Sequence, residues 1–144
     1  MKILLTGSSG FIGQHLLPRL KMIGEVFELK SDLTHHTGIQ QEVKEIQPDI
    51  VVHLAARTEV QKSFYEQVSF SEVNYVGTVN LIEACRAVDT MPYFVFASTM
   101  EVYGWQPISD EVEQTGTYVN NVAFDENTTP HPNAPYAVAK YGCE

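Results

Sequence analysis

A short apolar run leads directly into three regularly spaced glycines in KILLTGSSGFIG, residues 2–13. Residues 2–6 are typical of a buried strand, and an apolar helical spacing begins at Phe11. At such a strand-to-helix turn Gly7 permits the tight bend, Gly10 lets a diphosphate approach the backbone, and Gly13 lets the helix pack closely on the strand. The free amides of the helix would then bind the phosphates. The spacing is G-x-x-G-x-x-G, not G-x-G-x-x-G, and its alternative interpretation is a plain turn with a small-residue helix contact.

The rest of the chain alternates between short apolar runs typical of buried strands and segments with the apolar spacing of helices. Pro18 lies inside the first helical stretch and is expected to kink it. Strands are predicted at 2–6, 26–29, 49–56 and 93–99, and helices at 11–22, 39–46 and 69–88. Nearly continuous apolar strands alternating with helices predict a parallel sheet covered on both faces, an α/β doubly wound domain of the Rossmann type. The polar segment 105–133 is predicted to be a long functional loop.

The last ten residues, PYAVAKYGCE, place Lys140 four positions after Tyr136, on the same face of a helix. An ordinary tyrosine, with a pKa of about 10, is a poor base at neutral pH. A nearby ammonium stabilises the phenolate, so this pair is suited to general acid–base chemistry on a hydroxyl or ketone. The alternative is a surface tyrosine beside a solvated lysine.

Charge and composition narrow the classes of partner. The formal net charge is -9, which argues against nucleic acid and anionic membranes as partners. The cysteines (Cys85, Cys143) and the five histidines (His15, His35, His36, His53, His131) follow no metal-ligand spacing, so no metal site is predicted. Reduced cysteines, and the lack of any apolar run long enough for a signal peptide or a membrane span, favour the cytoplasm.

The type of dinucleotide stays open. A carboxylate about 20 residues after the glycines is expected to bind the adenosine ribose, and Asp32 lies 19 residues after Gly13. Lys30 lies close by in sequence and could meet a 2′-phosphate. We therefore expect NAD, with NADP not excluded.

Four motifs occur in order: the glycine turn, HLAA (53–56), STMEVYG (98–104) and Y-x-x-x-K (136–140). In these motifs the chain resembles the extended short-chain dehydrogenase/reductase family, and within it the NAD-dependent epimerase/dehydratases that act on nucleotide sugars. The resemblance covers the N-terminal half of a family member. It implies that residues 1–144 are an incomplete dinucleotide-binding domain, that the C-terminal substrate domain is absent, and that the catalytic helix would continue past Glu144. Such a chain is expected to bind cofactor with little turnover and to form a homodimer that covers its open apolar faces.

The resemblance also assigns roles to single residues. Asp32 and Leu33 match a pair that flanks the adenine; the distance from Asp32 to His53 suits this pair better than the ribose acid, which would then be missing. Asn74 matches an asparagine near the cofactor, with helix packing as its alternative role. The diphosphate would be lined by Gly7, Gly10, Phe11, Ile12 and Gly13, and the riboses by Leu54, Ala55 and Ala56, followed by Arg57 or Thr58. For HLAA the alternative is a buried strand end.

For the reaction, the resemblance implies Tyr136 as the base and Thr99 as the residue that positions the sugar oxygen. It implies that Lys140 lowers the pKa of Tyr136 and contacts the ribose. Glu101 would be a second acid or base. The 4,6-dehydratases often have Thr-Asp-Glu here, and Met100 replaces that aspartate. The alternatives are therefore an epimerase, a dehydratase, an NADPH-dependent reductase and a non-catalytic dinucleotide-binding module.

Overall fold

Four parallel strands form one sheet in the computed structural model, which describes residues 1–104 and 124–144. The strands are β1 (Lys2–Thr6), β2 (Glu25–Glu28), β3 (Ile50–His53) and β4 (Tyr93–Phe96). Their order is β2-β1-β3-β4, so the chain runs outward from β1 to β2 and then returns to the other side of β1. The predicted doubly wound parallel sheet is confirmed. The change of direction between β1 and β3 leaves a crevice at their carboxyl ends, where ligands bind in open α/β sheets.

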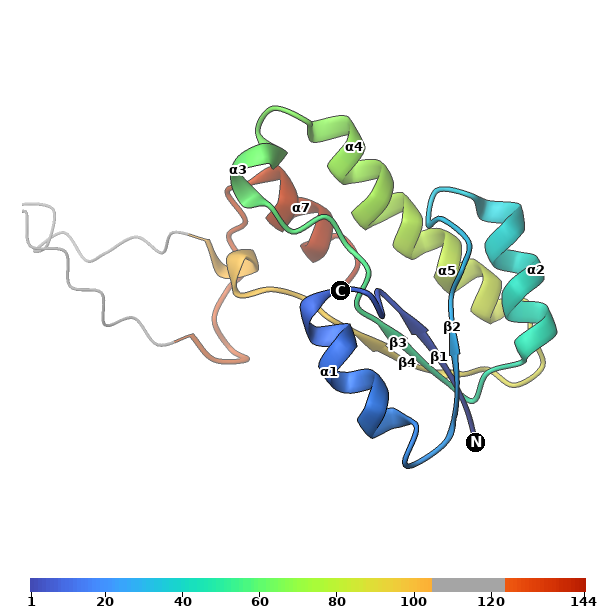
Figure 1. Cartoon of the computed structure of the whole chain (residues 1–144). Coiled ribbons are helices and arrows are strands. Elements are labelled where there is room, and N and C mark those ends of the chain that lie inside the picture. Colours follow the sequence, from blue (N-terminus) through green and yellow to red (C-terminus); the bar gives the residue numbers. More distant parts are fainter. Residues whose placement is uncertain (105–123) are drawn as a thin grey trace, which may run out of the picture.

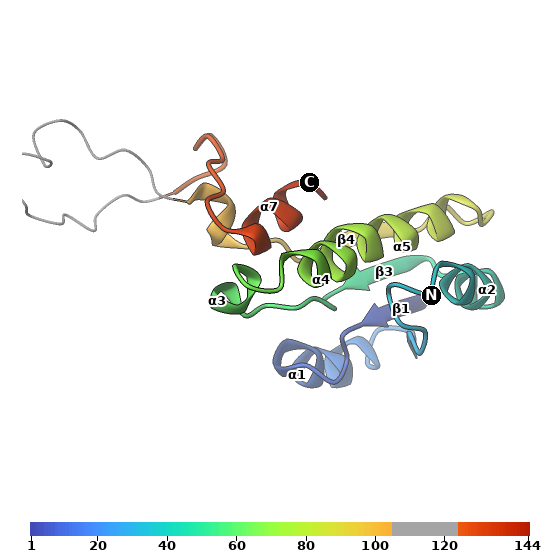
Figure 2. The same cartoon turned by 90° about the horizontal axis from the view of Figure 1, so that it is seen from above.

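Helices cover both faces of this sheet (Figures 1 and 2). Helix α1 (Phe11–Leu20) packs on the face that carries Ile3, Leu5 and Val52. Helices α2 (His36–Ile46) and α5 (Gly77–Arg86) cover the opposite face, whose core contains Leu4 and Val51. Alternate residues of β1 and β3 thus enter two separate cores, which is why the two strands have almost no polar residue before their ends.

The predicted helix 69–88 is a continuous helical segment with an irregular centre. It consists of α4 (Gln67–Ser71), a π-helical stretch η1 (Glu72–Val76) and α5. The prediction for 11–22 was also close, since α1 contains Pro18 and still runs to Leu20. A π-helical turn shifts the residues that follow it around the helix axis, and hydrophobic periodicity alone does not reveal it.

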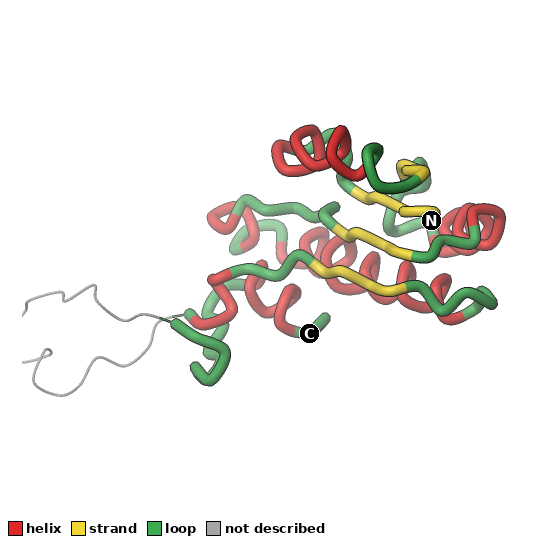
Figure 3. The backbone as a smooth tube through the Cα atoms, turned by 90° about the horizontal axis from the view of Figure 1, so that it is seen from below, coloured by secondary structure: helices red, strands yellow, loops and turns green. Residues whose placement is uncertain are grey.

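Two predicted strands were too long. Strand β3 ends at His53 instead of residue 56, and β4 ends at Phe96 instead of residue 99. Beyond these points the chain continues as loop and no longer as strand, as the tube in Figure 3 shows. The apolar character of residues 54–56 therefore reflects a cleft wall and not further sheet.

The C-terminal residues form helix α7 (Pro135–Tyr141), which begins with a proline at its first turn. It packs against α3 (Val60–Ser63), α4, η1 and the 3-10 helix η2 (Met100–Tyr103). Residues 105–123, most of the predicted functional loop, lie outside the described residues. Among the described helices, none combines the length and the apolar character that crossing a bilayer would require.

Candidate active site

The glycine turn at the end of β1 has the geometry that its sequence predicts. Gly7 has φ +71°, and a Cβ there would lie 2.6 Å from the Ala55 nitrogen. A Cβ on Gly13 would lie 2.1 Å from the carbonyl oxygen of Gly7. Gly10 is the N-cap of α1, and in the described structure no side chain caps this helix and no acidic residue lies in its first turn. The first amides of α1 are therefore available to an anion such as a diphosphate.

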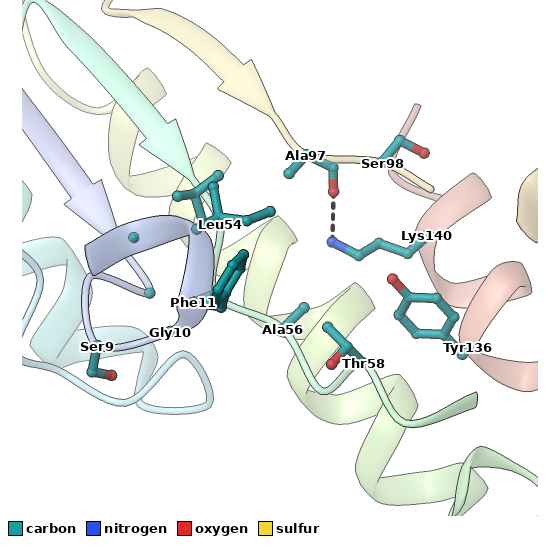
Figure 4. A pocket seen from close by; sticks show the side chains of 14 residues that line it. Ser9, Gly10, Phe11, Leu54, Ala56, Thr58, Ala97, Ser98, Tyr136 and Lys140 are labelled. Carbon is teal, nitrogen blue, oxygen red and sulfur yellow. Dashed lines mark hydrogen bonds between the residues drawn. The ribbon is translucent and has the colours of Figure 1, made fainter. Parts of the chain in front are cut away.

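This turn forms one wall of a cleft of about 560 Å³, a volume in the range of small-molecule and cofactor sites. The second wall is the segment after β3, and the third is α7 (Figure 4). The predicted residues that line the cleft are Gly7, Gly10, Phe11, Ile12, Gly13, Leu54, Ala55, Ala56, Tyr136 and Lys140. Ser9, Thr58, Ala97 and Ser98 complete the lining. The structure thus brings the glycine turn and the Tyr–Lys pair, 123 positions apart at their nearest, to one cavity.

Tyr136 and Lys140 reach from α7 toward the strand ends (Figure 4) and are only 6% and 3% exposed. The Lys140 Nζ donates a hydrogen bond to the Ala97 carbonyl at 2.7 Å and lies 4.6 Å from the centre of the Phe96 ring. Burial lowers the pKa of Lys140, opposed by the nearby Cys143. An ammonium has three protons, so two remain for groups on the cleft side.

Asp32 and Leu33 do not line this cleft. The exposed Asp32 carboxylate accepts hydrogen bonds from the Thr34 amide at 2.8 Å and from its hydroxyl, and these bonds lower the pKa of Asp32. Leu33 is 6% exposed and belongs to the core beneath α5. In this structure Asp32 shapes the turn before α2, while Leu33 packs against Gly77.

Asn74 also lies outside the cleft, and its amide oxygen and amide nitrogen both bond to the backbone of one residue. Its Oδ1 accepts from the Arg57 nitrogen at 2.8 Å, and its Nδ2 donates to the Arg57 oxygen at 2.9 Å. Arg57 is further held by Ser69 and Glu66 and lies over the ring of Phe70. Asn74 therefore fixes the segment whose neighbouring residues line the cleft.

Thr99 and Glu101 lie at the start of η2, next to the cleft lining. The Thr99 hydroxyl accepts a hydrogen bond from the Glu101 amide at 3.3 Å and thereby caps η2. This leaves the hydroxyl proton of Thr99 free to be donated elsewhere. Ser98 lines the cleft, and its hydroxyl donates a hydrogen bond to the carboxylate of Glu144.

Sequence reasoning missed a buried polar chain beneath the cleft. The imidazole of His53 lies between the hydroxyls of Thr6, 2.6 Å from Nδ1, and Thr78, 2.9 Å from Nε2. Burial, with a smaller effect of Lys140, lowers the pKa of His53 to about 4. The available signal was that Thr6 and His53 are polar residues that each directly follow an apolar run, Ile3 to Leu5 in β1 and Ile50 to Val52 in β3. Among the described residues, no three His, Cys, Asp or Glu side chains are grouped so as to hold a metal ion.

Known proteins are similar to this chain in sequence and in fold. A sequence model of the NAD dependent epimerase/dehydratase family matches residues 3–144. The dTDP-glucose 4,6-dehydratase of Salmonella typhimurium is 32% identical over 97% of this chain and 47% of its own length. The UDP-glucose 4-epimerase of Thermus thermophilus, solved with NAD, has a TM-score of 0.81 at 31% identity, covering 97% of this chain and 47% of the epimerase. The dTDP-4-dehydrorhamnose reductase of Bacillus anthracis, solved with NADP, has a TM-score of 0.80 at 26% identity and covers 98% and 46%. The chain thus spans about half the length of these proteins.

Proposed function

Because the chain belongs to the NAD dependent epimerase/dehydratase family, we propose that its 144 residues bind NAD or NADP and carry the acid–base residues of an enzyme acting on a nucleotide sugar. The observation that supports this most strongly is that the glycine turn and the Tyr136–Lys140 pair share one cleft. The residues fit a dinucleotide, since the turn offers uncapped amides and leaves no room for a Cβ at Gly13. When bound, the nicotinamide supplies a hydride acceptor or donor.

In the proposed reaction the side chains of α7 and η2 handle the proton. Tyr136 removes the proton from a sugar hydroxyl during oxidation and returns one during reduction. Lys140, held by the Ala97 carbonyl, keeps a positive charge beside the phenolate and presents its remaining protons to a ribose hydroxyl. Thr99 donates its free proton to the sugar oxygen. Glu101 would serve as a second acid or base.

The reaction after oxidation is proposed only at the level of class. With Met100 at the position of the dehydratase aspartate, we favour an epimerase or reductase over a 4,6-dehydratase. The exposed Lys30 at the end of β2 supports an NADPH-dependent reductase as the second candidate. A non-catalytic dinucleotide-binding module is the third. Since the relatives are about twice as long, we expect the 144-residue polypeptide to bind cofactor without appreciable turnover.

Two further proposals concern the oligomeric state and the cellular location of the protein. Val68, Tyr75 and Val76 are 72%, 44% and 45% exposed along α4 and η1, which supports a homodimer. A stable monomer in size-exclusion chromatography with light scattering would contradict this. The two free cysteines are compatible with the proposed cytoplasmic location.

Calorimetric titration with NAD, NADH, NADP and NADPH tests the proposed function, with Gly10→Ala as the matched control. A Cβ on Gly10 would come no closer to a surrounding atom than 3.3 Å, so this variant should fold. We expect the wild type to bind and Gly10→Ala to bind at least about tenfold more weakly, because the methyl group occupies the space of the diphosphate. No binding of any of the four ligands by the folded wild type would refute the function, and a strong preference for NADPH would favour the reductase.

A further inference from the structure

A buried chain of hydrogen bonds beneath the cleft joins β1, β3, η1 and α5. The Ala55 nitrogen lies 3.0 Å from the Thr6 hydroxyl, which lies 2.6 Å from His53 Nδ1. On the other side, His53 Nε2 lies 2.9 Å from the Thr78 hydroxyl, which lies 2.6 Å from the Asn74 carbonyl oxygen. Thr6, His53, Asn74 and Thr78 are each at most 1% exposed, so water is not an alternative partner.

The two ends of this hydrogen-bond chain, the Asn74 carbonyl and the Ala55 amide, determine where every proton lies. The Asn74 carbonyl can only accept, so the Thr78 hydroxyl donates to it and must accept the proton of His53 Nε2. The Ala55 amide can only donate, so Thr6 accepts it and directs its own proton to His53 Nδ1. His53 is therefore neutral and carries its proton on Nε2. A second proton, on Nδ1, would leave the Thr6 hydroxyl proton without an acceptor in this buried chain.

Two residues next to the Thr6 end of the hydrogen-bond chain, Gly7 and Ala55, line the cleft. Thr6 directly precedes Gly7. A Cβ on Gly7 would lie only 2.6 Å from the Ala55 nitrogen, so the backbones of Gly7 and Ala55 are in close contact. The Thr6 hydroxyl thus sets how closely the glycine turn and the segment after β3 approach each other. Its orientation depends in turn on the acceptor nitrogen of His53.

We propose that His53 is a positioning residue for the dinucleotide site, acting through Thr6 on the contact between Gly7 and Ala55. This inference rests on the proposed function, since it assumes that this contact shapes a dinucleotide site. His53 itself does not line the cleft. The hydrogen bond from Thr6 to His53 carries the effect on dinucleotide binding, and the hydrogen bond from His53 to Thr78 anchors the ring to α5.

Two substitutions separate these halves. Asparagine at position 53 can present its amide oxygen near the place of Nδ1 and so keep the bond from Thr6. Glutamine can reach the place of Nε2 and keep the bond to Thr78, but leaves Thr6 without its acceptor. We expect His53→Gln to weaken binding of the dinucleotide that the wild type prefers by about tenfold, the equivalent of one lost buried hydrogen bond. His53→Asn should lose clearly less affinity.

Calorimetric titration of the wild type and both variants is the test, with thermal unfolding to show that each is folded. In parallel, two-bond ¹H–¹⁵N NMR spectra of the ligand-free wild type report the tautomer of His53 directly, even if neither variant folds. A neutral ring protonated at Nε2 supports the proposal, and an Nδ1-protonated or charged ring overturns it. Equal affinities of His53→Gln and His53→Asn, or a greater loss for asparagine, also overturn it. A wild type that binds no dinucleotide refutes the proposed function instead, while the spectrum still judges the proton arrangement.

Discussion

The buried His53 should make the free energy of unfolding depend on pH in a defined window. Burial is the larger cause that lowers its pKa from 6.5 to about 4, and Lys140 is the smaller one. Below pH 6.5 the unfolded chain therefore binds a proton that the folded protein does not. Because the unfolded state binds more protons, the free energy of unfolding falls as the pH decreases from 6.5 toward 4 and is unaffected by this group above that window.

The size of the effect follows from the two pKa values. A difference between 6.5 and about 4 corresponds to about 3 kcal/mol over the whole window. This is a large fraction of the stability of a domain of this size, which is of order 10 kcal/mol. Within the window, the steepest slope expected from one proton is about 1.4 kcal/mol per pH unit.

Urea unfolding at constant ionic strength, between about pH 5 and pH 7.5, measures this slope. His53→Asn is the control, because it removes one titrating group and keeps the other four histidines. We expect the wild type to lose stability with falling pH more steeply than the variant, by close to one bound proton. Parallel pH profiles for the two proteins would show that His53 titrates alike in the folded and unfolded states and would refute this reasoning.

Three other substitutions test individual contacts. Gly13→Ala should lower the free energy of unfolding by roughly 3 kcal/mol, because the new Cβ overlaps the Gly7 carbonyl; chemical denaturation measures it, and an unchanged midpoint contradicts the geometry. Lys140→Met should weaken dinucleotide binding about tenfold in calorimetry, while the melting temperature stays equal or rises because a buried charge is removed. Asn74→Leu should cost about 2 kcal/mol of stability, because both backbone groups of Arg57 lose their partners; an unchanged midpoint in urea unfolding contradicts these two hydrogen bonds.

The part of the fold that sequence predicts well is the part governed by local chemistry and periodicity. Strand β1 matches its prediction, 2–6, because an apolar run ends abruptly in a glycine whose φ is +71°. The sequence also indicates the beginning of α7, because Pro135 suits the first turn of a helix. Helix α2 begins at His36, three residues before the predicted start, because the polar residues of its first turn do not disturb the apolar face that follows.

The directions of polar side chains could not be predicted in the same way. Asn74 lies in the π-helical stretch and turns its amide to Arg57, 17 residues away in sequence. His53 bonds Thr6 and Thr78, at separations of 47 and 25 residues. Periodicity states which face of an element is buried, but the partner of a buried polar group depends on tertiary register. These residues were thus recognisable as buried or as parts of motifs, but not by what they contact.

An acidic protein that binds an anionic cofactor must hold the negative charge locally. The chain carries a formal charge of -9, so its overall field opposes a dinucleotide. Two features of the cleft work against that field at short range: the uncapped amides at the start of α1 and the ammonium of Lys140. His53 beneath the cleft stays neutral, mainly because burial disfavours its charged form and secondly because Lys140 already places a positive charge nearby. In the proposed function, the positive charge of Lys140 would assist proton transfer at Tyr136, and the backbone dipoles of α1, which do not titrate, would hold the phosphates.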